Sequence, residues 1–584
     1  MKTEIKGSMS VEIILQGTYI QGTAETRIDP ACPAEIEDLK AFHNGVELDL
    51  SEQETEEAEA SLLSQYEELE AEGPEEDRDE TSSSMFDAIP YWTPMNFSPY
   101  QQAIFDAISS TEENILVEAV AGSGKTTTIV EAAKLISPFK RSMFLAFNKN
   151  IASELSVRLP SHVQAKTLHS LGWSICKENL GWFKTNDNKV RNILYYTVNK
   201  FDSMIEYEKK NLYLMRDDLC TYTSLLKAYC VGTGQEYDRM LPVISEHYGL
   251  DFPEGDFASN LRKTYIESIS YRKVLDFDDM IYFPTILNDI KFDTYDCIFV
   301  DEAQDLSEVQ IKFIKKLLSP KGRVILVGDR HQAIYGFNGA NVDSMDRVKA
   351  EFNCRELPLS ISYRCPVSVV NEAKLICSQI EASPTAKQGS VCTVEHYEDH
   401  ILDGDFLICR TIDPLKKALP KLLHKGRLIN FCYPDLINKM VTTVNLIQTK
   451  YGKINSERLS LCKENEIETF LRRGQKQQAG QVSATYELLE IIISLFPSES
   501  NYQHIFNTTL ACPQGVKLMS LHKAKGLEAK RVFLLNPDDI PHKNATKPWE
   551  ITQEYNLKYV AITRAKEELT YAKEWEETWQ VCVS

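Results

Sequence analysis

"NILVEAVAGSGKTTT", residues 114–128, decides the fold of this chain. An apolar run leads into a turn that contains Gly122 and Gly124, and a helical pattern begins at Lys125. A strand, a glycine-rich loop and a helix in this order are the context of a phosphate-binding loop. The glycines let backbone N–H groups close around phosphate oxygens at the positive end of the following helix. The stretch therefore predicts a nucleotide-binding α/β domain.

The loop also indicates roles for its side chains. Lys125 is expected to reach the β- and γ-phosphates, and the Thr126 hydroxyl to ligate Mg²⁺. The strict pattern begins with glycine, where Ala119 stands here. A glycine-rich turn with an incidental Lys-Thr pair is the alternative, and the strand and helix around it argue against that. We expect nucleotide contacts from Ala121, Gly122, Ser123, Gly124, Lys125, Thr126 and Thr127.

A second motif, "CIFVDEAQD" at residues 297–305, ends an apolar run with Asp301 and Glu302. An acid at the carboxyl end of a buried strand, beside a phosphate loop, is positioned to hold Mg²⁺. The adjacent Glu302 can then polarise an attacking water as general base. A solvated acidic turn would explain Asp-Glu alone, but the combination with a phosphate loop favours the catalytic interpretation.

Further apolar runs recur along the chain, each followed by turn residues and a helical pattern. Continuous apolar strands that alternate with helices indicate parallel sheets covered on both faces. Two groups of such runs, separated by helical insertions, predict two α/β domains. Near the end, "YVAITRAKEEL" (559–569) reads as a buried apolar segment that breaks at Thr563 and Arg564 and resumes as a charged helix.

Length and composition exclude several classes of protein. At 584 residues the chain is too long for one hydrophobic core. Its 43% hydrophobic and 26% charged residues are ordinary for a globular protein. No apolar stretch approaches the ~20 residues of a membrane helix, and the N-terminus does not resemble a signal peptide. The 14 cysteines show no CxxC pair and no zinc spacing, which fits reduced thiols in a cytoplasmic protein.

The net charge of −21 is concentrated in one tract. Between Glu52 and Glu80 there are 14 acidic residues and the single base Arg78, or −13, which leaves −8 for the rest of the chain. The total therefore does not exclude a basic groove for nucleic acid. The tract is either a solvated linker or a competitor of nucleic-acid phosphate for such a groove.

Taken together, the motifs resemble the UvrD/Rep/PcrA family of superfamily 1A DNA helicases over residues 95–572. They occur in family order as "FSPYQQAI", "AGSGKTT", "AFNKNIASEL", "AKTLHSLGW", "VLDFDDMI", "VDEAQD", "LVGDRHQAIYGFNGA", "LSISYRCP", "ICRTIDPLKKAL", "LMSLHKAKGLE" and "YVAITRAK". The chain departs from the family at Phe337, where tryptophan is usual, and at Ser362, where asparagine is usual. The resemblance implies two RecA-like parallel-sheet P-loop NTPase domains with helical insertions.

The resemblance also implies roles for residues beyond the phosphate loop. At the ATP site, Gln101 and Tyr363 would contact adenine, Glu528 the ribose, and Gln332, Arg364 and Arg564 the γ-phosphate. Arg564 would be an arginine finger, a group that contributes ~10³–10⁵ in rate in phosphoryl transfer. On the DNA-binding face, aromatic side chains would stack on bases and polar groups contact phosphate and sugar. The DNA contacts would come from Asn148, Lys149, Thr167, His169, Tyr335, Phe337, Asn338 and His522.

The family layout predicts the domain organisation. We expect a small N-terminal strand-rich segment at 1–50 and an acidic linker at 51–90. RecA-like domain 1A would comprise 91–174 and 274–356, with a helical 1B insertion at 175–273. Domain 2A would comprise 357–430 and 511–584. The insertion at 431–510 is smaller than the 2B subdomain of UvrD-like helicases, which suggests a reduced version of phage or mobile-element type.

The predicted function is an ATP-dependent DNA helicase that moves 3′→5′ along single strands and unwinds duplex in replication, repair or recombination. ATP and Mg²⁺ would be its cofactors, and single-stranded and tailed duplex DNA its partners, in a bacterial or phage-infected cytoplasm without membrane attachment. A protein partner could dock on the N-terminal segment and acidic tract. Two alternatives stay open: a translocase that remodels protein–DNA complexes with little unwinding, and an RNA substrate. A catalytically silent scaffold is disfavoured by the intact Lys125, Glu302, Gln332, Arg364 and Arg564.

Overall fold

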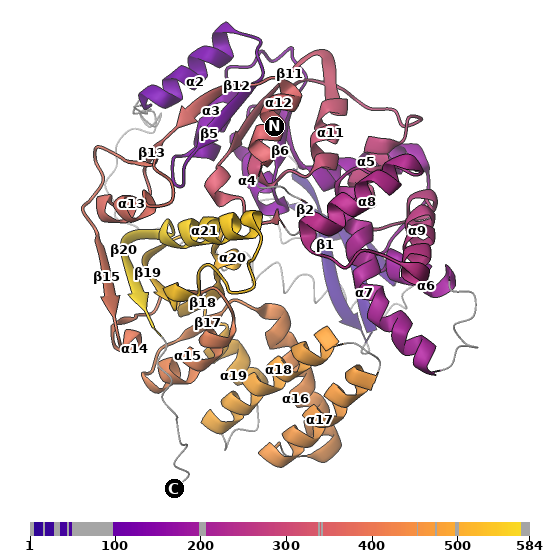
Figure 1. Ribbon diagram of the computed structural model, residues 1–584, viewed down its shortest axis with the longest axis vertical. Coiled ribbons are helices and arrows are strands. Elements are labelled where there is room, and N and C mark those ends of the chain that lie inside the picture. The colour runs from indigo at the N-terminus through magenta and orange to yellow at the C-terminus, as the bar shows by residue number, and fades with distance from the viewer. Residues whose placement is uncertain are drawn as a thin grey trace. The chain divides into compact units, whose positions relative to one another are not determined.

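A computed structural model of the chain describes residues 5–15, 18–28, 35–43, 46–48, 97–197, 206–336, 339, 343–452, 454–472, 476–496 and 502–573. The chain forms two compact units, Met1–Pro94 and Met95–Ser584, each of which is described by itself (Figure 1). The acidic tract that the sequence indicates between Glu52 and Glu80 lies outside the described residues.

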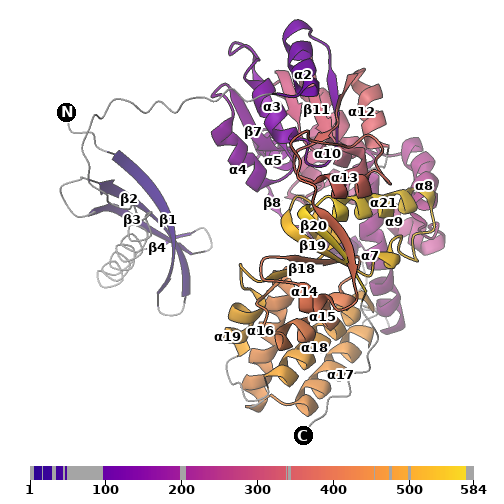
Figure 2. The same cartoon turned by 90° about the vertical axis from the view of Figure 1, so that its left-hand side faces the viewer.

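The first unit contains a four-stranded antiparallel sheet in the order β1-β2-β3-β4 (Figure 2). Its long hairpin pairs Ile5 with Ile28 at one end and Leu15 with Thr18 at the other. The predicted strand-rich N-terminal segment is therefore an antiparallel meander. Its strands are β1 (Ile5–Leu15), β2 (Thr18–Ile28), β3 (Glu35–His43) and β4 (Val46–Leu48).

The second unit begins with a six-stranded parallel sheet in the order β12-β5-β11-β10-β6-β7. Because the strands are parallel, their carboxyl ends share one edge, where ligands bind in open α/β sheets. The phosphate loop, the Asp-Glu motif and the Thr-x-His motif all follow strands of this sheet. The strands are β5 (Ile115–Ala119), β6 (Ser142–Ala146), β7 (Val163–Thr167), β10 (Tyr295–Val300), β11 (Leu318–Gly328) and β12 (Arg355–Leu359).

A second six-stranded parallel sheet has the order β15-β20-β19-β16-β18-β17. Its strands come from both sides of a long helical insertion, because β17 ends at Phe431 and β18 begins at Val516. The two parallel sheets predicted from the apolar runs are thus confirmed. The strands are β15 (Ser390–Val394), β16 (Phe406–Cys409), β17 (Ile429–Phe431), β18 (Val516–Ser520), β19 (Ala529–Leu535) and β20 (Ala565–Ala572).

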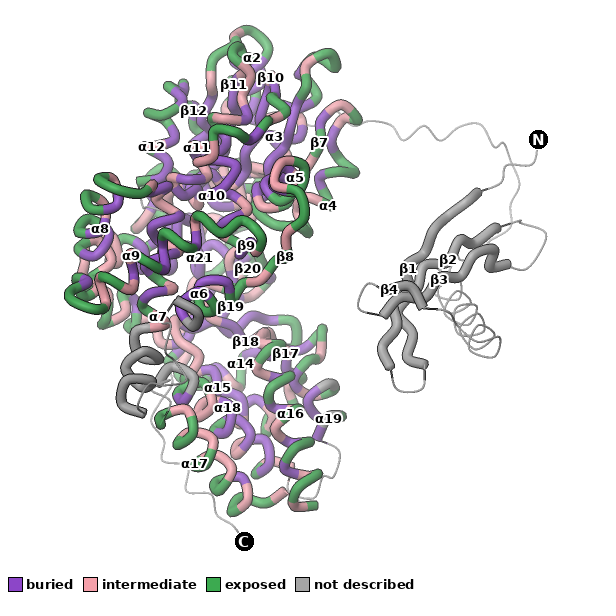
Figure 3. Tube along the Cα trace, turned by 90° about the vertical axis from the view of Figure 1, so that its right-hand side faces the viewer, coloured by how far each residue is buried: buried purple, intermediate pink, exposed green. Residues whose placement is uncertain are grey.

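Helices cover both faces of each sheet, and the inner strands β5, β6 and β16 are buried along their whole length (Figure 3). Successive residues of a strand point to opposite faces, so Leu116 joins one core and Val117 the other. On the first sheet, α2 (Pro99–Ser110), α3 (Lys125–Ala133) and α4 (Lys149–Arg158) cover one face. The other face carries α5 (Leu168–Leu180), α10 (Asp279–Ile286), α11 (Glu308–Leu317) and α12 (Ser344–Phe352).

The second sheet is covered in the same way. One face packs on α15 (Asp413–His424), α16 (Pro434–Tyr451) and α18 (Lys476–Leu495), with α17 (Ser456–Arg472) and α19 (Tyr502–Ile505) in the same insertion. The opposite face packs on α13 (Val367–Ala373), α20 (Leu521–Ala524) and α21 (Pro548–Ile562). The domain bounds set from the sequence stay a prediction.

The segment around Arg564 differs from the sequence-based expectation. Tyr559 to Ile562 form the end of helix α21, and Ala565–Ala572 form strand β20 rather than a charged helix. Alanine, lysine, glutamate and leucine favour helix intrinsically. Here β20 lies between β15 and β19, and pairing on both sides overrides that preference. Arg564 therefore stands at a helix-to-strand turn.

A buried charge cluster ties the insertion after α5 to the first sheet. Lys227 contacts Asp276 at 2.7 Å and Asp279 at 2.8 Å, and Lys189 contacts Asp279 at 2.6 Å. All four side chains are almost fully buried, and breaking such a pair costs about 3–5 kcal/mol. The "DFDD" element thus anchors two helices of the insertion, which comprises α6 (Lys189–Thr197), α7 (Glu206–Ala228), α8 (Gln235–Tyr248) and α9 (Gly255–Ser270).

Among the described residues, no helix is long and apolar enough to cross a membrane.

Candidate nucleotide site and strand-binding face

The phosphate loop adopts the backbone that its glycines permit. Gly122 and Gly124 have φ of +73° and +78°, a left-handed region that favours glycine. Gly124 is the N-cap of α3, whose first residue is Lys125. The first N–H groups of α3 have no intrahelical partner, so the end of the loop is a ready anion site.

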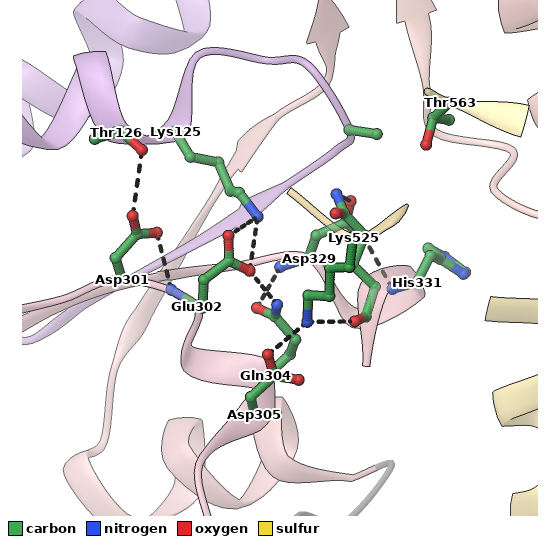
Figure 4. Close-up of polar contacts among 12 residues, drawn as sticks. Lys125, Thr126, Asp301, Glu302, Gln304, Asp305, Asp329, His331, Lys525 and Thr563 are labelled. Carbon is green, nitrogen blue, oxygen red and sulfur yellow. Dashed lines mark hydrogen bonds and ion pairs between the residues drawn. The ribbon is translucent and has the colours of Figure 1, made fainter. Parts of the chain in front are cut away.

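The acids after β10 face the residues that begin α3 (Figure 4). Lys125 Nζ lies 3.1 Å from Glu302 Oε1, and the Thr126 hydroxyl donates to Asp301 Oδ2 at 3.2 Å. Glu302 has a left-handed backbone with φ of +55°, and its N–H donates to Asp301 Oδ1 at 2.8 Å. The two motifs that the sequence paired in function therefore meet directly.

Burial and close charges set the ionisation of this cluster. Burial first, and the Glu302 carboxylate second, raise the pKa of Asp301. Burial alone would raise the pKa of Glu302, but Lys125 and then Lys525 outweigh it and lower that pKa. Burial likewise opposes the charge of Lys125, yet Glu302, Asp329 and Asp301 raise its pKa. Glu302 therefore stays a carboxylate, as a general base must.

Lys525 reaches this cluster from the second sheet. Its Nζ bonds Asp305 at 2.5 Å and donates to the carbonyl of Gln332 at 2.9 Å. The Gln332 side chain donates to Asp329 at 2.6 Å, and Gln304 bonds both Glu302 and the Asp329 N–H. A continuous chain of polar contacts thus runs from the second sheet to Glu302.

The phosphate loop also contacts helix α21, which covers the second sheet, and the segment after β12. Ala121 N–H donates to the Tyr559 hydroxyl at 3.0 Å, and Tyr363 N–H donates to the Gly122 carbonyl at 2.9 Å. A Cβ on Gly122 would lie 2.5 Å from the Arg364 Cβ, which is closer than real Cβ atoms come. The loop therefore has room only for glycine at this position.

The two arginines assigned to the γ-phosphate make different contacts. Arg364 Nε donates to Glu528 at 2.7 Å at the rim of the site. Arg564 is 1% exposed, and it donates to the carbonyls of Val560 and Leu527 and to the Thr563 hydroxyl. Burial, with the Arg364 guanidinium second, lowers the pKa of Arg564 to about 10. Arg564 thus braces its own domain, and no described contact joins it to the phosphate loop.

The residues assigned to adenine and ribose lie around the same loop. Gln101, in the first turn of α2, accepts from the N–H of the N-cap residue Ser98 and donates to Thr128 at 3.0 Å. Its Nε2 lies 4.0 Å from a Cβ built on Gly124. The Tyr363 side chain is half exposed. Glu528 bonds Arg364 and also Lys566. The fold brings these three residues toward the phosphate loop through α2, the segment after β12, and the segment before β19.

The DNA-binding candidates of the first sheet follow two neighbouring strands, β6 and β7. Asn148 caps α4 by accepting from Ile151 N–H at 2.9 Å, and Lys149 is exposed beside it. Thr167 caps α5 through a reciprocal bond with Ser170. The His169 ring stacks on Phe277 with centroids 3.7 Å apart, and burial lowers its pKa to about 4.

A second aromatic group combines Phe147 and Tyr335, which follow β6 and β11 of the first sheet, with Lys525, which follows α20. Tyr335 stacks on Phe147 at 6.0 Å, and the Lys525 ammonium lies 4.8 Å from the Tyr335 ring centroid. Burial raises the pKa of Tyr335 to about 12. Phe337 and Asn338 lie outside the described residues. His522 is the second residue of α20 (Leu521–Ala524), three residues before Lys525, and burial lowers the pKa of His522 to about 4.

Several contacts were not predicted from the sequence. Phe147, Phe277 and Lys525 lie inside motifs that we quoted but assigned to other side chains. Tyr559 reads as an apolar core residue, and only the fold shows its hydroxyl against the phosphate loop. Phe147 and Phe277 are exposed, and each directly precedes polar residues, Asn148 and Asp278, which is the sequence signal that could have indicated their exposure.

These features define a nucleotide-binding protein with a P-loop on one parallel sheet and contacts to a second. The UvrD/REP helicase N-terminal domain matches residues 100–353, and the UvrD-like helicase C-terminal domain matches residues 515–570. Together the two matches cover just over half of the chain. The chain belongs to the UvrD/Rep-like helicase family.

Individual relatives show the same family. The chain is 22% identical over 542 residues to F-box DNA helicase protein 1 of Schizosaccharomyces pombe, covering 80% of this chain and 56% of that protein. It is 28% identical over 297 residues to ATP-dependent DNA helicase Rep of Buchnera aphidicola from Schizaphis graminum, covering 47% of this chain and 43% of Rep. F-box DNA helicase 1 of Gallus gallus is 24% identical over 507 residues, 82% of this chain and 49% of that protein. The chain spans about half the length of these curated relatives.

Arg564→Ala is expected to destabilise the second sheet as well as to alter the site. It leaves the buried carbonyls of Val560 and Leu527 without this donor, a loss of about 2–4 kcal/mol of unfolding free energy. Thermal and urea unfolding measure it, with Arg158→Ala as control because that arginine makes an exposed pair with Glu154. Equal stabilities of the two variants would contradict a bracing role.

Proposed function

We propose that this chain is an ATP-driven motor that moves 3′→5′ along single-stranded DNA and unwinds duplex ahead of it. The observation that carries this proposal is that the phosphate loop, which follows β5 of the first sheet, also lies against Tyr559 of α21, a helix that covers the second sheet, and against Arg364. Nucleotide in that loop would interact with groups of both domains, so its presence would change their separation. Family membership supports the proposal, and the direction of movement rests on the family resemblance.

The donor set at the loop fits a magnesium–ATP complex. Mg²⁺ prefers oxygen ligands and is held by one or two protein groups together with substrate phosphates. Thr126 Oγ1 and Asp301 Oδ2 lie 3.2 Å apart at the start of α3 and would supply those groups. The ion would neutralise charge on the phosphates.

Glu302 would orient the attacking water. The Glu302 carboxylate contacts both Lys125 and Gln304. A phosphate that binds Lys125 would compete with Glu302 for the Lys125 ammonium. Glu302 would then be free to accept a proton from water, while Lys125 turns to the phosphate. Arg364 and Arg564 would stabilise charge on the γ-phosphate only after rearranging from their present partners, Glu528 and the carbonyls of the second domain.

The strand would bind across the carboxyl ends of the first sheet. Phe147 and Tyr335 offer ring faces for bases, and base–aromatic stacking contributes ~1–3 kcal/mol per base. Lys525 lies over the Tyr335 ring and bonds Asp305 and Gln332. A base that displaces this stack would therefore disturb the same lysine that lowers the pKa of Glu302, which couples strand binding to hydrolysis.

Lys125→Ala and Glu302→Gln are each expected to reduce DNA-stimulated ATP hydrolysis by at least ~10³-fold. Glu302→Gln removes the base but keeps Asp301, so nucleotide affinity should change less than threefold, whereas Lys125→Ala should weaken it. Steady-state hydrolysis and fluorescent-nucleotide titration measure the two effects. Hydrolysis near the wild-type rate in Glu302→Gln would mean that another group is the base.

Unwinding of duplexes with a 3′ or a 5′ single-stranded tail tests the activity itself. We expect strand separation with the 3′ tail only, and stimulation of hydrolysis by DNA rather than RNA oligomers. Efficient displacement of a bound protein from a 3′-tailed strand, with no strand separation, would identify a remodelling translocase. Unwinding from the 5′ tail would contradict the proposed direction.

We propose that the first unit regulates binding or docks a protein partner. It is a separate compact unit, and the acidic tract between Glu52 and Glu80 follows its sheet. A protein that lacks residues 1–85 keeps every motif, so its basal hydrolysis should survive. If the tract competes with DNA phosphate, the truncated protein binds single strands more tightly at low salt, and the gain fades near 0.15 M salt, roughly physiological ionic strength. Equal affinities at low salt would leave the tract as a spacer.

The described cysteines are free thiols, which fits the reducing cytoplasm that we propose for this activity.

A further inference from the structure

Helix α5 carries a row of aromatic and basic side chains that begins at His169 in the motif "AKTLHSLGW" and continues past the end of that motif. His169, Trp173 and Lys177 recur every four residues, so they lie along one side of the helix. The opposite side is buried, and a Cβ on Gly172 would lie 2.0 Å from the Met280 carbonyl of α10. This close approach fixes which side of α5 faces outward. The Lys177 ammonium lies 5.0 Å from the Trp173 ring centroid.

The segment after α5 extends the row. Phe183 meets the edge of Trp173 with ring centroids 6.4 Å apart, and Trp182 precedes it. The Lys184 ammonium lies 5.8 Å from the Trp182 ring centroid. Lys184 begins the short strand β8 (Lys184–Thr185), which pairs with β9 (Val274–Leu275) just before Phe277. Figures 2 and 3 both show β8 close to α5. We call Trp173, Lys177, Trp182 and Lys184 the α5–β8 strip.

The exposure of the strip is unusual for tryptophan. The Trp182 side chain is 70% exposed and that of Trp173 is 36% exposed. Large exposed aromatic groups beside polar residues mark interaction sites on soluble proteins. Lys177 and Lys184 make no ion pair among the described residues, although the chain as a whole has a net charge of −21. The strip therefore presents ring faces and unneutralised cations together.

The strip is continuous with the strand-binding face already described. Helix α5, which carries Trp173 and Lys177 of the strip, begins after its N-cap Thr167 and holds His169 in its first turn. His169 stacks on Phe277, which is 54% exposed. Thr167 ends strand β7, at the same sheet edge as Asn148 and Lys149 after β6. A strand that contacts Thr167 and His169 can continue along α5 without leaving exposed surface.

We propose that the α5–β8 strip is an additional binding site for single-stranded nucleic acid, which lengthens the strand track beyond the family motifs. Bases stack on Trp173 and Trp182, and Lys177 and Lys184 contact the flanking phosphates. Ring faces bind all four bases, so the site has low sequence preference. The inference rests on the proposed function, because it requires that His169 and Thr167 contact the same strand. A protein partner on the strip is the alternative that the experiment excludes.

The test compares the affinity for oligo(dT) of two lengths, about 6 and about 20 nucleotides, chosen to lie below and above a typical site size. Fluorescence anisotropy measures wild-type protein, Trp173→Ala/Trp182→Ala and Lys177→Gln/Lys184→Gln. We expect each double variant to lose about tenfold or more in affinity for the long oligomer, and much less for the short one. The lysine variant should also reduce the dependence of log affinity on log salt by about 1.

The matched control is Phe139→Ala/Lys321→Gln, because Phe139 is exposed and Lys321 is an exposed lysine elsewhere on the first domain. It should bind both oligomers as wild type does, and circular dichroism should show that every variant is folded. Tryptophan fluorescence of the wild type should fall when the long oligomer binds, and fall less in Trp173→Phe/Trp182→Phe.

The results separate this inference from the proposed function. Tight wild-type binding with equal losses of affinity for both lengths, or with none, would overturn the strip while leaving the motor intact. Failure of the wild type to bind either oligomer would overturn both.

Discussion

The structure depends on how closely the phosphate loop approaches helix α21 and the segment after β12. Ala121 donates to Tyr559, Tyr363 donates to Gly122, and the Arg364 Cβ occupies the space that a side chain on Gly122 would need. Glycine is required at position 122 for two reasons: its backbone has a φ of +73°, and a side chain there would overlap the Arg364 Cβ. The backbone that would cradle phosphate is therefore also the backbone that contacts the second domain. Any change in the loop on ligand binding would reach the second sheet through helix α21, which packs on it.

Charge couples the two domains a second time. Lys125 from the first domain and Lys525 from the second approach the same group of acids, Asp301, Glu302 and Asp305. Opposite charges in a buried, low-dielectric site interact strongly, so the position of Lys525 affects the ionisation of Glu302. Because Lys525 also covers Tyr335, a strand on the aromatic pair and a nucleotide on the loop influence one set of contacts. This is the physical basis for expecting that DNA stimulates hydrolysis.

The sequence predicted those features that depend on local patterns, and it did not predict those that depend on contacts between distant segments. The P-loop and the Asp-Glu motif are short segments whose spacing reflects one ligand, so Lys125, Thr126, Asp301 and Glu302 were found together. The parallel sheets followed from continuous apolar runs. By contrast, "AKEELTYA" has helix-favouring residues but forms β20, because it pairs with β15 and β19. These partners are distant in sequence, so the local pattern did not predict the strand. The roles of Tyr559 and Lys525 likewise depend on contacts between segments 193 to 438 residues apart. The inward turn of Arg564 depends on the Leu527 carbonyl, 37 residues away in sequence.

The central claim is that nucleotide in the phosphate loop changes the separation of the two parallel sheets. Probes at the exposed positions Phe139 on the first domain and Leu375 on the second, attached through unnatural amino acids, would report this separation by distance-dependent energy transfer. The account predicts distinct distances with an ATP analogue, with ADP and without nucleotide, and the same distance in all three conditions for Lys125→Ala. One unchanged distance in the wild-type protein, measured while nucleotide is demonstrably bound, would contradict it.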